Sequence, residues 1–195
     1  MGCGGVVRSS IVERETLETR VRVELRLEPG SIRVETGIGF LDHVTETLIY
    51  YMGASGVFTV EEVKRVDDHH VAEDLYLALG EALRRASGTG IARFGHAIIP
   101  MDEVLALAAV DVSGRPGSWV RIPFTREYIG GLSTEVIPHM VQAMASTMRS
   151  TIHIEVLRPG NNHHMAEASF KALGAALGQA LRETGRVFST KGVLG

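Results

Sequence analysis

Cysteine is almost absent from this 195-residue chain, which has one, Cys3, in the glycine-rich start MGCGG. One cysteine cannot close a disulfide within the chain, so a disulfide-stabilised secreted scaffold is excluded. We expect a cytoplasmic protein in which Cys3 is a free thiol.

Long apolar runs and an excess of one charge are lacking as well. No stretch approaches the roughly 18 apolar residues of a membrane span, and the start has no signal-peptide apolar segment. The formal net charge is -3, and the lysines and arginines are spread along the chain, which disfavours a nucleic-acid partner. With 45% hydrophobic residues, the composition indicates a globular enzyme or binding protein without membrane or nucleic-acid partners.

The chain contains an internal repeat. The segment HHVAEDLYLALGEAL at 69–83 matches HHMAEASFKALGAAL at 163–177 in nine of fifteen positions without a gap. Apolar residues follow at helical spacing in both copies, so each copy is predicted to be a helix. These residues are Leu75, Leu79 and Leu83 in the first copy and Phe170, Leu173 and Leu177 in the second.

The remaining pattern predicts an α+β fold. Alternating apolar residues predict strands at 19–27, 56–63, 105–112, 119–124 and 151–157. Further helices are expected at 40–52 and 133–148, the latter with Ser133 as N-cap and Pro138 at a kink or an early turn. We expect an internal duplication with halves 1–90 and 91–195 forming one packed unit, built of mostly antiparallel sheets with helices on one face of each.

The repeated histidines and glutamates are spaced like metal ligands. On a helix His69 shares a face with Glu73, and His163 shares one with Glu167, so each pair can bind one ion. The adjacent His70 and His164 point about 100° away and would suit a second ion. If the two copies of the repeat face each other, each of the two metal sites would take ligands from both copies. The upstream histidines His43 and His139 would complete the two sites.

A structural role for these histidines is the alternative, because single histidines on amphipathic helices are often only solvated or capped. Six of the eight histidines fall within this pattern, however, and a mixed imidazole and carboxylate set suits Mn, Fe, Co, Ni or Zn. The acids Asp67 and Asp68 could favour the helix start electrostatically or, like Asp74, orient ligands; we favour the helix-start role for the first two.

Six motifs, in this order, resemble the imidazoleglycerol-phosphate dehydratase family over nearly the whole chain. They are TGIGFLDH (36–43), DDHHVAED (67–74), RFGHAIIPMDE (93–103), DVSGRP (111–116), NNHHMAEASFKALGAAL (161–177) and STKGVL (189–194).

The resemblance implies site residues and a cofactor, two Mn²⁺ per active site with other first-row ions as alternatives. One ion would be bound by His69, Glu73, His139 and His164, and the other by His43, His70, His163 and Glu167. The substrate phosphate would be bound by Arg93, Arg115, Ser189, Thr190 and Lys191, because guanidinium and ammonium groups suit a dianion. Glu18 corresponds to the family's acidic residue near the reacting carbons, so the catalytic set would be Glu18, His43, His70, Glu73 and Glu167.

The implied reaction is the elimination of water from D-erythro-imidazole-glycerol phosphate to give imidazole acetol phosphate, in L-histidine biosynthesis. No carbonyl acidifies the carbon that loses its hydrogen, so the dinuclear site would bind the imidazole ring as an imidazolate whose electrons expel hydroxide. The family also implies a homo-oligomeric shell of 24 subunits with sites at subunit contacts. A dinuclear metallohydrolase and a non-catalytic metal-storage shell remain as alternatives.

Overall fold

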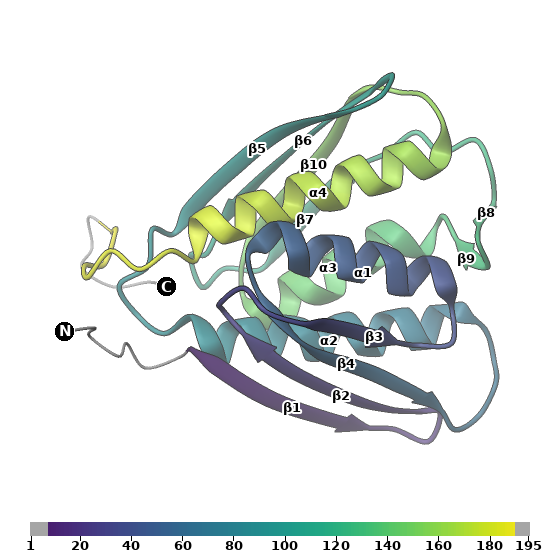
Figure 1. Cartoon of the computed structure of the whole chain (residues 1–195), viewed down its shortest axis with the longest axis horizontal. Coiled ribbons are helices and arrows are strands. Elements are labelled where there is room, and N and C mark those ends of the chain that lie inside the picture. Colours follow the sequence, from purple (N-terminus) through teal and green to yellow (C-terminus); the bar gives the residue numbers. More distant parts are fainter. Residues whose placement is uncertain (1–7, 190–195) are drawn as a thin grey trace.

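The computed structural model describes residues 8–189 and shows two β-sheets with the helices between them (Figure 1). Within the described residues no helix is long and apolar enough to cross a membrane. The predictions for Cys3, Thr190 and Lys191 lie outside the described residues.

The first sheet has the strand order β1-β2-β4-β3 and is mostly antiparallel. Only β3 and β4 pair in parallel. Inward and outward residues alternate along β2, with Val21, Val23 and Leu25 buried beneath α2. The strands are β1 (Ser9–Glu15), β2 (Thr19–Arg26), β3 (Ile32–Glu35) and β4 (Ser55–Glu62).

The second sheet repeats this arrangement with the order β5-β6-β10-β7. Again two pairings are antiparallel and the last, between β10 and β7, is parallel. The strands are β5 (Phe94–Met101), β6 (Val104–Asp111), β7 (Gly117–Arg121) and β10 (Thr151–Arg158), and a small hairpin is formed by β8 (Tyr128–Ile129) and β9 (Leu132–Ser133). The matching sheet orders confirm the predicted α+β fold, and they support the duplication.

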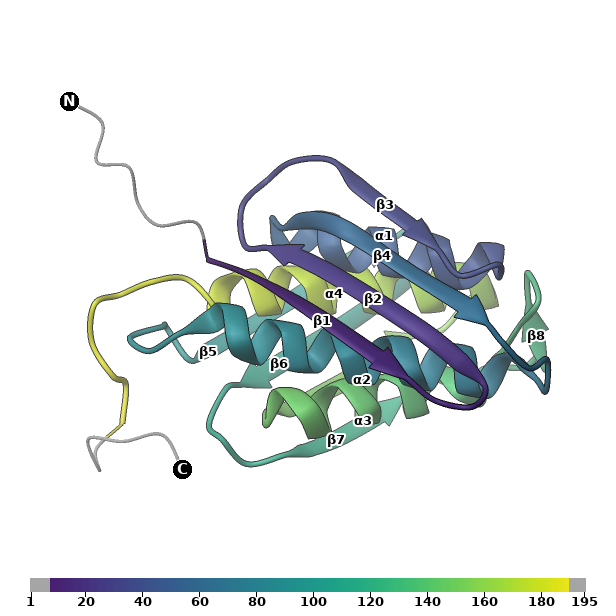
Figure 2. The same cartoon turned by 90° about the horizontal axis from the view of Figure 1, so that it is seen from below.

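Four described helices form the middle layer, and all begin at the same end of the molecule, on the right in Figures 1 and 2. They are α1 (Gly39–Met52), α2 (Asp68–Ser87), α3 (Val136–Met148) and α4 (Asn162–Ala180). The apolar residues predicted for α2 and α4 are fully buried. Helices pack across the two halves of the repeat, α1 against α4 and α2 against α3.

The glycine that both repeat copies carry in their LG dipeptide explains this close packing. A Cβ on Gly80 would lie 2.4 Å from the Met144 carbonyl oxygen of α3. A Cβ on Gly174 would lie 2.5 Å from the Leu48 carbonyl oxygen of α1. Neither helix pair could approach as closely with a larger residue at these positions.

Some predicted boundaries were wrong. Ser133 lies in β9, and α3 begins at Val136 without a side-chain cap from Ser133 or any other residue of 8–189. Pro138 lies in the first turn of α3, which confirms the early-turn placement; its missing N–H costs no helical hydrogen bond there. The strand expected at 119–124 is shifted to Gly117–Arg121.

Sequence analysis missed the two-residue strands β8 and β9 and, among the longer strands, β1, β3 and β5. The three longer strands share one property. Each lies at the edge of its sheet, where one side has no strand partner among the described residues. Edge strands tolerate charged residues, glycine and proline, so their sequences carry a weaker alternating pattern.

Candidate metal centres

The predicted ligands lie at the start of the four helices, at the end where all four begin (Figure 1). Asp67 caps α2 by accepting a hydrogen bond from the N–H of His69, at 3.0 Å. Asn161 caps α4 in the same way through the N–H of His163, at 2.9 Å. In both copies the cap thus lies two residues before the first histidine of the pair, and the bond made by Asp67 confirms its helix-start role.

The first ligand group combines α2 with α3. It contains His69, Glu73 and His139, whose candidate ligand atoms all lie within 4.8 Å of one another. His139 Nε2 is 3.0 Å from Glu73 Oε1, and His69 Nε2 is 4.0 Å from Glu73 Oε2. Two imidazoles and a carboxylate at this spacing fit a divalent first-row ion.

The second group combines α1 with α4. It contains His43, His163 and Glu167, again within 4.8 Å. Glu167 Oε2 lies 3.2 Å from His163 Nε2 and 3.4 Å from His43 Nε2. The His43 Nε2 atom is buried and has no hydrogen bond among residues 8–189, which fits a nitrogen that binds a metal ion.

Glu167 also contacts Lys171 one helical turn further along α4, at 2.9 Å. Burial alone would raise the pKa of Glu167, but the adjacent Lys171 ammonium and the nearby His43 imidazole outweigh burial and lower the pKa. The Lys171 ammonium is in turn 5.6 Å from the centre of the Tyr51 ring. Sequence analysis did not identify Lys171, although its i, i+4 spacing from Glu167 was a usable signal.

The other two predicted ligands lie apart from these groups in the described chain. His70 Nδ1 is buried and lies 2.6 Å from Glu18 Oε2, without the geometry of a hydrogen bond. His164 Nδ1 is 3.0 Å from Glu103 Oε2 and its Nε2 is 3.7 Å from Asp102 Oδ2. The chain thus brings together three members of each predicted set of four.

Glu103 was not identified from the sequence, although it ends the motif RFGHAIIPMDE. It accepts a hydrogen bond from the N–H of Asn161 at 2.6 Å. That bond, followed by the contact with His164, lowers the pKa of Glu103 to about 2.

Two other acids of α2, Asp68 and Asp74, make no hydrogen bond or ion pair with a predicted ligand within residues 8–189. Asp68 accepts a hydrogen bond from the N–H of Ser133 and so joins α2 to β9. Asp74 is buried and bonds Arg14 at 2.7 Å and Thr19 at 2.5 Å. This network fastens the turn that carries Glu18 to α2, so Asp74 supports Glu18 and not a ligand histidine.

The predicted phosphate residues differ in their surroundings. Arg93 binds both carboxylate oxygens of Asp111, at 2.7 and 3.1 Å, and the carbonyl oxygen of Phe188 at 2.8 Å. Arg115 is exposed, and its guanidinium makes no hydrogen bond or ion pair within the described part of the chain. The N–H of Ser189 donates to the Val187 carbonyl oxygen.

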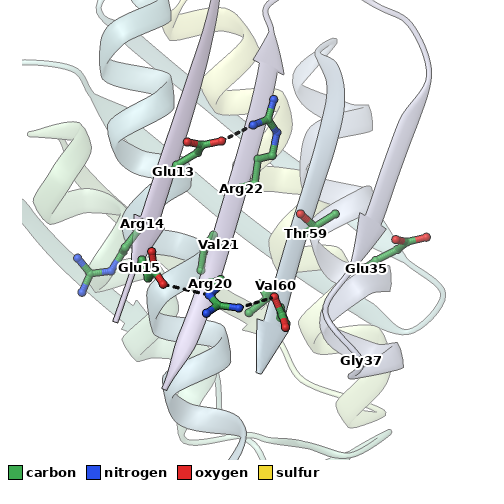
Figure 3. Close-up of a pocket in the computed structure, with 11 residues that line it drawn as sticks. Glu13, Arg14, Glu15, Arg20, Val21, Arg22, Glu35, Gly37, Thr59 and Val60 are labelled. Atoms are coloured by element: carbon green, nitrogen blue, oxygen red, sulfur yellow. Dashed lines mark hydrogen bonds and ion pairs between the residues drawn. The ribbon is translucent and has the colours of Figure 1, made fainter. Parts of the chain in front are cut away.

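A hollow of about 520 Å³ on the first sheet is lined by none of the predicted site residues that lie within 8–189 (Figure 3). Arg20 pairs there with Glu15 and Glu61, and Arg22 pairs with Glu13. Since these guanidinium groups are already neutralised by glutamates, the hollow is a poor site for an anionic ligand.

Fold and site together define a duplicated α+β protein with two histidine and carboxylate groups suited to divalent metal ions. The sequence model of the imidazoleglycerol-phosphate dehydratase family matches residues 36–177. The chain belongs to this family, and it is an enzyme of the dehydratase class.

Individual relatives agree with this assignment. An imidazoleglycerol-phosphate dehydratase from Caldivirga maquilingensis is 53% identical over 190 residues, covering 96% of this chain and 99% of its own. One from Phaffia rhodozyma is 44% identical and covers all of both chains. A crystal structure of the Pyrococcus furiosus protein in complex with (S)-C348 has a TM-score of 0.84 at 38% identity, covering 94% of this chain and 100% of that one.

Proposed function

We propose that this enzyme eliminates water from D-erythro-imidazole-glycerol phosphate to give imidazole acetol phosphate in histidine biosynthesis, in the cytoplasm, with two Mn²⁺ ions per active site. The observation that carries the proposal is the pair of three-residue ligand groups, which occur at equivalent places in the two halves of the repeat. The substrate named for the relatives supports the same reaction.

We further propose that each ligand group is completed by a histidine of another copy of the chain. His164 would complete the group of His69, Glu73 and His139, and His70 would complete the group of His43, His163 and Glu167. Both histidine side chains keep exposed surface, 29% for His164 and 37% for His70. This arrangement supports a homo-oligomer, proposed as a shell of 24 subunits, with sites at subunit contacts.

The residues of the chain would have distinct tasks in the reaction. Bound divalent ions would supply Lewis-acid stabilisation of negative charge on the substrate's imidazole ring. Glu18 would move the proton at the reacting carbon, because its carboxylate lies beside His70 and makes no hydrogen bond within residues 8–189.

The substrate phosphate would bind to Arg115, whose guanidinium is unpaired among the described residues, together with Ser189, Thr190 and Lys191. Arg93 would contribute mainly by anchoring the chain at Phe188, just before this tail.

The first experiment measures imidazole acetol phosphate formed from imidazole glycerol phosphate by wild type, His70→Ala and the control His96→Ala, whose side chain is exposed and outside both ligand groups. We expect activity that chelation removes and Mn²⁺ restores, with loss only in His70→Ala. Metal-loaded wild type that leaves this substrate unchanged would refute the proposed reaction. Release of inorganic phosphate would indicate the metallohydrolase alternative instead.

Mixed assemblies test the completion of each site by a second copy. His164→Ala and His69→Ala would each be inactive alone, because each lacks a ligand of the same ion. Dissociated and reassembled together, they would regain activity wherever an intact His69 group meets an intact His164 of another chain. If every ligand came from one chain, the mixture would stay inactive.

The acid/base role of Glu18 is tested with Glu18→Gln and the control Glu15→Gln, a neighbouring glutamate whose side chain is 71% exposed. Loss of a general acid/base lowers kcat about 10²- to 10⁴-fold, and we expect this for Glu18→Gln alone, at equal Mn²⁺ content. Turnover of Glu18→Gln near that of wild type would remove the assignment.

A further inference from the structure

The turn between β5 and β6 carries a glutamate at the position that Glu18 occupies in the other half of the repeat. Glu18 directly precedes β2, and Glu103 directly precedes β6. The strands begin alike, because Thr19 and Val104 are both 1% exposed and the same inward and outward alternation follows. Glu18 and Glu103 are therefore equivalent positions of the duplication.

Both glutamates contact the second histidine of a repeated pair, and both do so at Nδ1. Glu18 Oε2 lies 2.6 Å from His70 Nδ1, and Glu103 Oε2 lies 3.0 Å from His164 Nδ1. The contacts differ in one respect. Glu103 uses its other oxygen to accept the N–H of Asn161, whereas the Glu18 carboxylate makes no hydrogen bond within residues 8–189.

We propose that Glu103 is a positioning residue that fixes the tautomer and direction of the His164 ring. This inference rests on the proposed role of His164 as a metal ligand. An ionised carboxylate only accepts hydrogen bonds, so His164 must carry its proton on Nδ1 and present the lone pair of Nε2. Anchored at both oxygens, Glu103 holds the ring in place, while the equivalent Glu18 carboxylate, which makes no hydrogen bond within residues 8–189, would transfer the proton.

A third metal site made of Asp102, Glu103 and His164 is the competing explanation for this cluster. Glu103 is already engaged with the Asn161 N–H, and in the proposed tautomer the His164 Nδ1 that faces it would carry the proton. Only His164 Nε2 and the Asp102 carboxylate, whose side chain is 74% exposed, would remain as ligands. Two ligands of this kind are too few for a specific site.

The test variant is Glu103→Gln. Glutamine can keep the contact with the Asn161 N–H, but it would place a hydrogen-bond donor instead of an acceptor against His164 Nδ1. Its amide oxygen can still accept the Asn161 N–H. Its NH₂ group would then face His164 Nδ1 and move the ring proton to Nε2, the atom required by the metal. A purely structural role of Glu103 would survive this change, whereas a positioning role would not.

We expect Glu103→Gln to bind one of the two Mn²⁺ ions about 10- to 100-fold more weakly, as for other groups that orient ligands, with the other ion unaffected. Mn²⁺ titration followed by electron paramagnetic resonance measures both affinities. The control is Asp102→Asn, in the same turn, which should bind both ions like wild type. In a His164→Ala background, Glu103→Gln should cause no further weakening.

Equal Mn²⁺ binding by wild type and Glu103→Gln would overturn the inference and leave the proposed function intact. An equal loss of Mn²⁺ affinity in Asp102→Asn would also overturn it. So would a further loss of Mn²⁺ affinity when Glu103→Gln is added to His164→Ala, because the effect would then not act through His164. A wild type that binds no Mn²⁺ would refute the metal site and this inference together.

Discussion

Replacing Gly174 by alanine should separate the two helices that bring the second ligand group together. The new Cβ would lie 2.5 Å from the Leu48 carbonyl oxygen, where ordinary contact begins at 3.4 Å, so α1 and α4 must move apart by about 0.9 Å. Overpacking of this kind costs about 1–3 kcal/mol, and the higher helix propensity of alanine returns about 1 kcal/mol. We expect a net loss of up to about 2 kcal/mol in the free energy of unfolding.

The displacement should also weaken metal binding, because His43 lies on α1 while His163 and Glu167 lie on α4. A shift of about 0.9 Å exceeds the tolerance of about 0.2 Å for metal–ligand distances. Urea unfolding of the metal-free protein and Mn²⁺ titration measure the two effects. The control is Gly39→Ala in the first turn of α1, where a Cβ meets nothing within 4 Å. A Gly174→Ala variant as stable as Gly39→Ala, with both ions bound normally, would refute the reasoning.

Two further predictions concern charged residues. Arg93→Met should lower the free energy of unfolding by about 1.5–3 kcal/mol, because Asp111 loses its charged hydrogen-bond partner in a largely buried pair. Arg115→Met should weaken substrate binding with little change in urea unfolding. Equal stability of the two variants would contradict this prediction. The pKa of Glu103 is lowered from the ordinary 4.5 to about 2. Its ionised form therefore stabilises the fold above pH 4.5, and this contribution to stability is lost as the pH falls toward 2. The unfolding free energies of metal-free wild type and Glu103→Gln should therefore converge over that range, and parallel curves would argue against it.

Much of the fold could be predicted because its signals are local. The apolar spacing of the repeat identified α2 and α4, and alternation identified the inner strands β2, β4, β6 and β10. The edge strands β1, β3 and β5 were missed because their stability depends on pairing with strands whose positions are not encoded locally. Ser133 was wrongly taken as a helix cap because the hairpin of β8 and β9 instead uses it as a strand residue.

The sequence by itself determined which residues could act together on one helix. His69 with Glu73 and His163 with Glu167 follow from the 3.6-residue turn alone, and the family motifs identify the class of enzyme. Only the tertiary structure decided that each helix of one half packs against a helix of the other, so that His139 joins the His69 group and His43 joins the His163 group. It also decided the contact between Glu103 and His164, since residues 61 positions apart meet only when the β5–β6 turn folds over the start of α4.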